Sequence, residues 1–134
     1  MPPPLQFKSQ SIHIKLVAGF YYLAAVIIGI IALAYIFASP WVKSLFATVP
    51  AAQEMSTSTY VMWGLALLLI AGLEAFFAFN IGNLSKIARA IAIVISAIGA
   101  AWAIFGWFNY QGYENIMFLV LHTYFLWALV TKWK

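Results

Sequence analysis

The sequence predicts an all-α integral membrane protein, a four-helix bundle with both ends of the chain in the cytoplasm. Hydrophobic residues make up 66% of its 134 residues and charged residues only 7%, whereas a soluble domain carries about 25% charged residues. The hydrophobic residues fall in long runs, and most basic residues lie between these runs on one side. We therefore expect one membrane domain over residues 1–134, because neither a soluble fold nor a disordered chain fits this composition.

Four hydrophobic runs have the length of a membrane span. They cover residues 16–38, 60–79, 90–108 and 116–131, and only Glu74 interrupts the second run with a charge. A helix rises about 1.5 Å per residue, so about 20 residues cross a hydrocarbon core of about 30 Å. Lipid offers no hydrogen-bond partner to an exposed backbone, so each run is predicted to be a helix.

The polar residues 1–15 predict a flexible cytoplasmic tail, because the prolines at positions 2–4 oppose a helix start. Lys8 and Lys15 precede the first run, and Ala32-Leu33-Ala34 near its end resembles a signal-peptide cleavage site. The 23-residue length of the run 16–38 favours a membrane helix over a cleaved signal peptide.

Three connections and a short end complete the layout. The long outer loop 39–59 begins with serine followed by proline, a pair typical of helix starts. Apolar residues spaced by four then predict a short interfacial helix over residues 40–46, with the rest of that loop irregular. Residues 80–89 form an inner loop, residues 109–115 a second outer loop, and residues 132–134 the cytoplasmic end.

The basic residues indicate the orientation of the chain. Six of the seven lie in the tail, the inner loop and the C-terminal end, and Lys43 alone lies on the opposite side. Basic residues are enriched on the cytoplasmic side, so both ends should be cytoplasmic. Aromatic residues form an outer belt, and Trp133 anchors the inner end. The predicted belt consists of Trp41, Tyr60, Trp63, Trp107, Tyr110 and Tyr113.

Small residues recur every 3.5 positions in three of the four spans. This period is typical of left-handed helix packing, and small residues allow helices to approach closely in lipid. The third span has an unbroken series and should be central, whereas the fourth has none and should be peripheral. The alternative is that alanine and glycine are simply frequent in membrane helices. The predicted packing residues are Ala25, Gly29, Ala71, Ala78, Ala92, Gly99, Ala103 and Gly106.

Glu74 is the one acidic residue within a span. A charge at the membrane centre costs about 2.5–3.5 kcal/mol, and loss of hydration favours the neutral acid. Side chains lean toward the N-terminus of their helix. On this basis Ser96 is the first candidate partner of Glu74, Tyr22 the second and Arg89 the third.

His122 lies near the middle of the fourth span and supports two interpretations of the polar residues. Glu74, Ser96 and His122 could form a hydrogen-bonded network that fixes helix register, or a relay for protons or ions. The chain contains no cysteine, no nucleophile motif and no glycine-rich phosphate loop after a strand. We therefore expect no enzyme activity, no metal site and no cofactor of the chain's own. The basic residues that give the net charge of +4 flank the spans, as in membrane proteins generally. We therefore expect no nucleic-acid partner.

Two stretches resemble a family of small four-helix bacterial membrane proteins of unknown activity. These stretches are residues 80–96, NIGNLSKIARAIAIVIS, and residues 124–129, YFLWAL. In that family a Trp-Ala-Arg opens the third helix and a Tyr-x-Leu-Trp lies near the end of the fourth. Here Ile87 stands in place of the tryptophan. The resemblance implies the bacterial inner membrane and carries no activity or site residue.

Two functional hypotheses follow from these patterns. The first is a non-catalytic accessory or scaffold subunit that packs in the bilayer against other membrane subunits or against itself. The second is a small oligomeric transporter or channel for an ion or solute, with Glu74 and His122 in its pathway.

Overall fold

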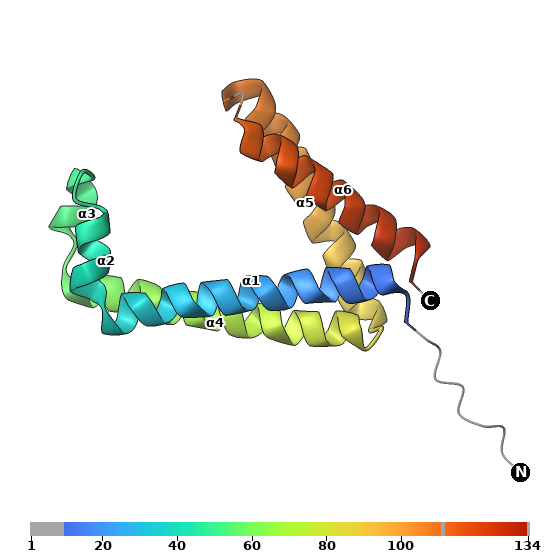
Figure 1. Cartoon of the computed structure of the whole chain (residues 1–134), viewed down its shortest axis with the longest axis horizontal. Coiled ribbons are helices and arrows are strands. Elements are labelled where there is room, and N and C mark those ends of the chain that lie inside the picture. The colour runs from blue at the N-terminus through green and yellow to red at the C-terminus, as the bar shows by residue number, and fades with distance from the viewer. Residues whose placement is uncertain (1–9, 111, 134) are drawn as a thin grey trace, which may run out of the picture. The chain divides into compact units, whose positions relative to one another are not determined.

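The computed structural model describes residues 10–110 and 112–133, and in these ranges the chain is all-α (Figure 1). Four helices are long and apolar enough to cross a membrane, which suggests a membrane protein and confirms the predicted all-α chain. Pro2–Pro4 and Lys8 of the predicted tail, and Lys134 at the other end, lie outside the described residues. The elements are α1 (Ile12–Phe37), α2 (Ser39–Leu45), α3 (Pro50–Glu54), α4 (Thr57–Gly82), α5 (Lys86–Tyr110) and α6 (Tyr113–Thr131).

The long helices extend beyond the predicted hydrophobic runs. The first helix begins at Ile12, so the last residues of the predicted tail are helical, and the fourth span begins at Tyr113. The predicted inner loop 80–89 shortens to residues 83–85. Hydrophobicity marks only the part of a helix that fits the hydrocarbon, whereas the backbone hydrogen bonds continue into the interface.

A Schellman motif ends α4. Leu84 has a φ of 57°, in the left-handed region. Its N–H donates to the carbonyl of Ile81 at 3.0 Å, and the N–H of Ser85 donates to the carbonyl of Asn80 at 2.9 Å. These are the two bonds of the motif that commonly ends helices with glycine. The motif explains how three residues suffice to connect α4 to α5.

The outer connection contains two short helices. The predicted interfacial helix over residues 40–46 corresponds to α2, one residue earlier. The prediction of irregular structure over residues 47–59 is wrong, because Pro50 begins α3 and Thr57 begins α4. Proline at the first turn of a helix loses no backbone hydrogen bond, which is the signal that could have revealed α3.

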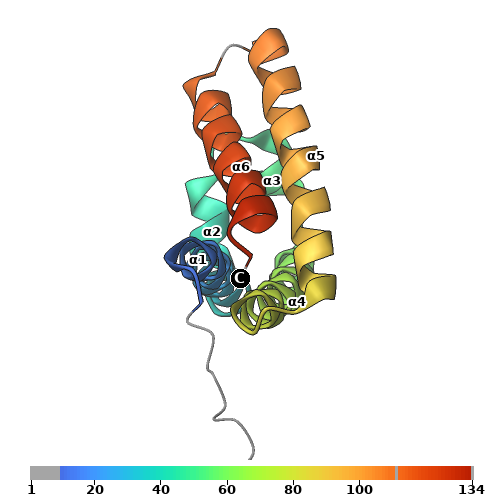
Figure 2. The ribbon, with the colours of Figure 1, turned by 90° about the vertical axis from the view of Figure 1, so that its right-hand side faces the viewer.

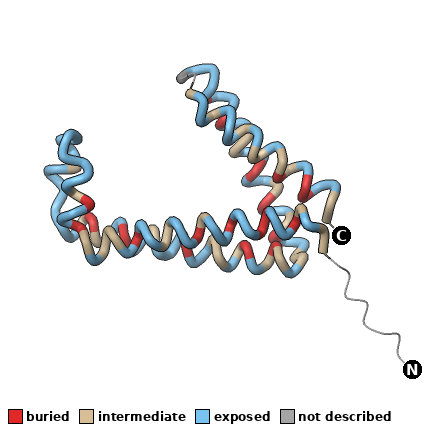
Figure 3. The backbone as a smooth tube through the Cα atoms, viewed as in Figure 1, coloured by how far each residue is buried: buried red, intermediate tan, exposed pale blue. Residues whose placement is uncertain are grey.

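The described residues form two compact units. The hairpin unit contains α5, α6, the part of α1 up to Gly19 and the part of α4 from Phe79. The outer unit, residues 20–78, contains the remainder of α1 and α4 with α2 and α3 between them. In both units the long helices carry buried residues interspersed with half-buried and exposed ones (Figure 3).

In the hairpin unit, α5 and α6 are antiparallel and lie side by side (Figure 2). The predicted small residues of α5 lie on the buried side of this helix: Ala92, Ser96, Ala103 and Gly106 are buried and Gly99 is half-buried. The fourth span, which was expected to be peripheral, packs against α5 in this unit. α6 covers the small residues of α5, with His122 against Gly99 and Asn115 against Gly106.

In the outer unit, α1 and α4 lie side by side along their length (Figure 1). A Cβ placed on Gly29 would be 3.9 Å from the Cβ of Ala71, which is ordinary contact. Ala25 and Ala71 are buried in this unit, as is Ala78 at its end.

The buried tyrosine of α1 is Tyr21 and not Tyr22. Tyr21 is 9% exposed and its ring packs edge-on against Phe77 at 5.1 Å, whereas Tyr22 is 43% exposed. The 3.5-residue spacing of the small residues places Tyr22 in their series as its one large member, but the buried ring belongs to Tyr21, one residue earlier. One residue corresponds to about 100° of rotation around a helix, so this shift changes which ring is buried.

Candidate functional site

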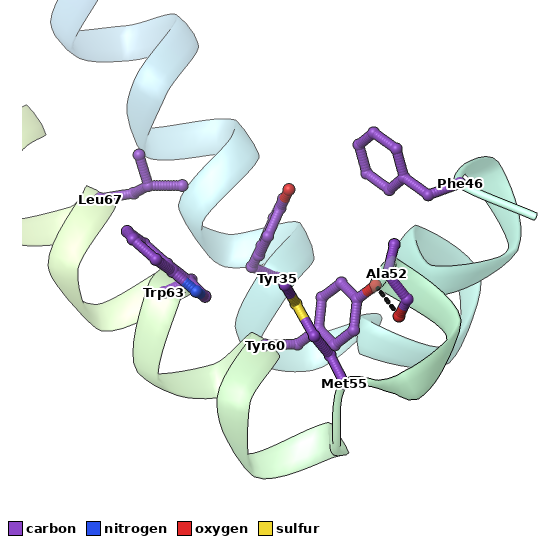
Figure 4. Close-up of a pocket in the computed structure, with 7 residues that line it drawn as sticks. All are labelled: Tyr35, Phe46, Ala52, Met55, Tyr60, Trp63 and Leu67. Atoms are coloured by element: carbon purple, nitrogen blue, oxygen red, sulfur yellow. Dashed lines mark hydrogen bonds between the residues drawn. The ribbon is translucent and has the colours of Figure 1, made fainter. Parts of the chain in front are cut away.

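The outer unit contains an aromatic pocket at the α2–α3 connection (Figure 4). Hydrogen bonds fold this connection back on itself and onto α4. The Lys43 ammonium donates to the carbonyl of Met55 at 3.1 Å, and the Gln53 amide donates to the carbonyls of Lys43 and Phe46 at 2.9 and 3.1 Å. The Tyr60 hydroxyl donates to the carbonyl of Ala52 at 2.8 Å, which attaches α3 to the first turn of α4.

This aromatic pocket has a volume of about 350 Å³. The rings of Tyr35 and Tyr60 lie 5.7 Å apart. Because Tyr60 already bonds to Ala52, the lining offers aromatic and aliphatic surface but no acid–base pair. It can hold an apolar or ring-shaped group. The lining residues are Tyr35, Phe46, Ala52, Met55, Tyr60, Trp63 and Leu67.

Sequence reasoning missed this pocket. Tyr60 and Trp63 were predicted as members of an outer aromatic belt, and Phe46 was predicted to lie on a short helix. The pocket depends on α3, which brings Ala52 and Met55 against these rings. No spacing of aromatic residues alone indicates such a fold-back.

Glu74 lies on α4 in the outer unit and is half-buried. Its Oε2 is shielded from solvent and has no hydrogen-bond partner within residues 10–110 and 112–133. Of its three predicted partners, Tyr22 belongs to the same unit but is exposed, whereas Ser96 and Arg89 belong to the hairpin unit. A carboxyl oxygen that is shielded and unpaired is unusual, because buried polar atoms are generally hydrogen-bonded.

Ser96 and His122 both lie within the α5–α6 hairpin, yet no hydrogen bond joins them. Ser96 is fully buried, and its Oγ has no partner among the described residues. The same is true of Nδ1 of His122, whose ring lies against Gly99 and edge-on to Phe125. The arrangement fills space at the helix contact, and it provides no continuous proton path in this unit.

Arg89 binds the C-terminal end of α6. Its Nε donates to the carbonyl of Leu129 at 2.8 Å and its Nη2 to the carbonyl of Val130 at 3.1 Å. The guanidinium also lies 5.5 Å from the ring centre of Trp133. The last carbonyls of a helix lack partners within it, and a cation there also interacts favourably with the helix dipole. This capping role accounts for Arg89 without Glu74.

His13 takes part in a cluster that sequence reasoning did not find. Its Nδ1 and the hydroxyl of Tyr124 are 2.9 Å apart and share a hydrogen bond, and its ring lies edge-on to Trp127 at 4.9 Å. In the same unit, the side-chain amide of Gln10 donates to the carbonyl of Gly82. The three-residue spacing of Tyr124 and Trp127, which places both on one face of α6, was the available signal.

The described residues contain no grouping of three or more histidine, cysteine, aspartate or glutamate side chains that could hold a metal ion. Comparisons with models of known protein families, with curated proteins and with solved structures found no match to this chain.

Proposed function

We propose that this protein is a non-catalytic accessory or scaffold subunit of a larger membrane complex. Its four long helices would form a bundle in the bacterial inner membrane, with both ends cytoplasmic. The observation that supports this best is the carboxyl of Glu74, whose Oε2 is shielded but unpaired within the described chain. An unpaired polar group in hydrocarbon costs several kcal/mol, so a rotamer change that lets this half-buried side chain accept a hydrogen bond from another subunit would stabilise the assembly.

The surroundings of Glu74 fit a helix-binding surface. Ile70 and Leu73 lie beside Glu74 on the same helix, within about 100° of it around the helix axis, and are 44% and 60% exposed. Packing in lipid depends on van der Waals contact together with a few interhelical hydrogen bonds. A partner helix could supply both, with apolar contact to these side chains and a donor to the carboxyl.

The polar residues of the hairpin unit support a structural role. His122 and Asn115 fill the space above glycines of α5, and Arg89 caps α6. None of these side chains is arranged with a second titratable group as a catalytic pair would be. The hairpin therefore resembles a rigid packing element more than a reaction site.

The proposal is tested by the mass of the complex after extraction into polymer-bounded lipid discs. We expect the 14.9 kDa chain in a larger assembly with one recurring partner at fixed stoichiometry. Glu74→Gln keeps a hydrogen-bonding group and should retain the partner, whereas Glu74→Leu should lose it. Glu114→Gln, which changes an acid in the first turn of α6, is the matched control. A wild-type chain that is always monomeric, or only self-associated, would overturn the proposal.

The second candidate is a small oligomeric transporter or channel that uses Glu74 and His122. The unpaired carboxyl of Glu74 favours it, because ionisable residues within spans often line ion pathways. The close packing of the His122 ring against Gly99 argues against a pathway through the hairpin. Ion flux into liposomes that falls on His122→Ala, while the variant stays folded, would support this candidate over the first.

A further inference from the structure

We propose that the basic end of the α5–α6 hairpin binds the headgroup phosphate of an anionic phospholipid. A groove of about 320 Å³ opens there, lined by Lys86, Arg89, Ala90, Ile93 and Trp133. These residues combine two cations, an indole and an apolar floor. That combination matches a lipid with a charged head and hydrocarbon chains.

Within residues 10–110 and 112–133, no acidic side chain lies beside the cations of this lipid groove. The chain contains three acidic residues: Glu54 in α3, Glu74 within α4 and Glu114 in the first turn of α6. Only Glu114 belongs to the hairpin unit, at the opposite end of α6 from Arg89 and its carbonyl partners. Glutamate side chains of the described residues therefore do not neutralise Lys86 and Arg89, and this pair of cations favours an added anion.

Lys86 is the residue free to bind this anion. It is exposed at the first position of α5 and makes no hydrogen bond or ion pair with the described residues. Arg89 is positioned by its two bonds to α6, yet a guanidinium has five N–H groups and only two are used. Arg89, held by its bonds to α6, and the unpaired Lys86 both line the groove and can thus bind one phosphate together.

The apolar part of the groove distinguishes a lipid from a free phosphate ion. Ala90 and Ile93 line it below the cations, and Val94 is 57% exposed on the next turn of α5. Trp133 lies over the guanidinium of Arg89, and indole rings favour the headgroup level of a membrane. An acyl chain could follow the exposed side of α5 from this point.

The test uses purified full-length protein in detergent, titrated with phosphatidylglycerol or phosphatidylcholine whose acyl chains carry bromine. Bromine quenches tryptophan fluorescence on contact, and the difference between wild type and Trp133→Phe isolates the signal of Trp133. We expect phosphatidylglycerol to quench Trp133 at about a fivefold lower mole fraction than phosphatidylcholine. Lys86→Gln should remove most of this preference.

Lys15→Gln is the matched control, because Lys15 is also exposed in the hairpin unit but does not line the groove. It removes the same charge and should keep the preference. Equal quenching by the two lipids, or an equal loss in both lysine variants, would overturn the proposal. Displacement of phosphatidylglycerol by millimolar inorganic phosphate would also overturn it, since the site would then recognise the ion and not the lipid.

Discussion

Both units bring two helices close together at a glycine, but the group that lies opposite the glycine differs. In the outer unit, a Cβ on Gly64 would lie 2.9 Å from the backbone carbonyl oxygen of Ala32 and 2.7 Å from the side chain of Ile36. In the hairpin unit, the three atoms nearest to a Cβ on Gly99 would all belong to the ring of His122. The first contact joins a helix to the backbone of its neighbour, and the second joins a helix to a side chain that can rotate. Close approach is therefore more rigidly required between α1 and α4 than between α5 and α6.

The largest effect should come from Gly64→Ala. The added methyl group would have to separate the backbones of α1 and α4, and overpacking of this kind costs about 1–3 kcal/mol. We expect that loss in the free energy of unfolding, measured by steric trapping in bicelles. Gly72→Ala is the matched control on the same helix, because a Cβ at Gly72 meets nothing within 4 Å. Equal losses in both variants would remove the backbone contact as the cause.

A double-mutant cycle at Gly99 and His122 tests whether the His122 ring fills the space above Gly99 in the hairpin unit. Gly99→Ala should destabilise the hairpin, because the new methyl group would lie 2.7 Å from Cδ2 of His122. His122→Ala removes the ring, so the double variant should recover part of the free energy of unfolding that Gly99→Ala loses. We expect a coupling free energy of about 1–2 kcal/mol. Strict additivity of the two changes would show that the ring does not fill the space above Gly99.

Arg89→Ala should have a more local effect. It removes two hydrogen bonds to the last turn of α6, each of which contributes about 0.5–1.5 kcal/mol. It also removes a favourable charge at a helix end, which contributes about 0.3–1 kcal/mol more. Hydrogen–deuterium exchange should rise at the C-terminal turn of α6 and stay unchanged in the outer unit. Lys86→Ala, which removes an exposed charge without a partner, should leave that exchange unchanged. A uniform rise throughout the chain would contradict a capping role.

The smallest effect should come from Tyr60→Phe in the outer unit. The change removes one hydrogen bond to Ala52, and such a bond contributes about 0.5–1.5 kcal/mol. Exchange should increase in residues 50–55, while α1 and α4 remain as protected as in wild type. Tyr22→Phe is the control, since Tyr22 is exposed. If exchange in residues 50–55 is unchanged, the bond does not hold α3 in place.

The four spans could be predicted because hydrophobicity and length are properties of each segment alone. The buried side of α5 was also predictable, because its small residues recur without a break from Ala92 to Gly106. The packing of α6 against α5 was not predictable from small residues, because α6 carries no such series. A large polar side chain opposite a glycine, such as His122 over Gly99, makes an equally close contact.

The candidate sites were less predictable than the spans. Depth in the membrane ranked the partners of Glu74, but depth says nothing about the rotation of a helix, and Tyr22 is exposed whereas Tyr21 is buried. Arg89 was considered only as a partner for a carboxylate, although helix-end carbonyls are acceptors in every helix. The aromatic pocket requires the fold-back at α3, which the hydrophobic pattern of five residues does not reveal.

The central claim is that the polar side chains within the spans serve association between helices and not transport. The most direct test measures proton flux and complex mass for wild type and Glu74→Gln in the same proteoliposomes. We expect both proteins to assemble with the partner and neither to make the vesicles more permeable than protein-free vesicles. A wild-type flux above that of empty vesicles, abolished by Glu74→Gln while assembly is retained, would contradict this claim.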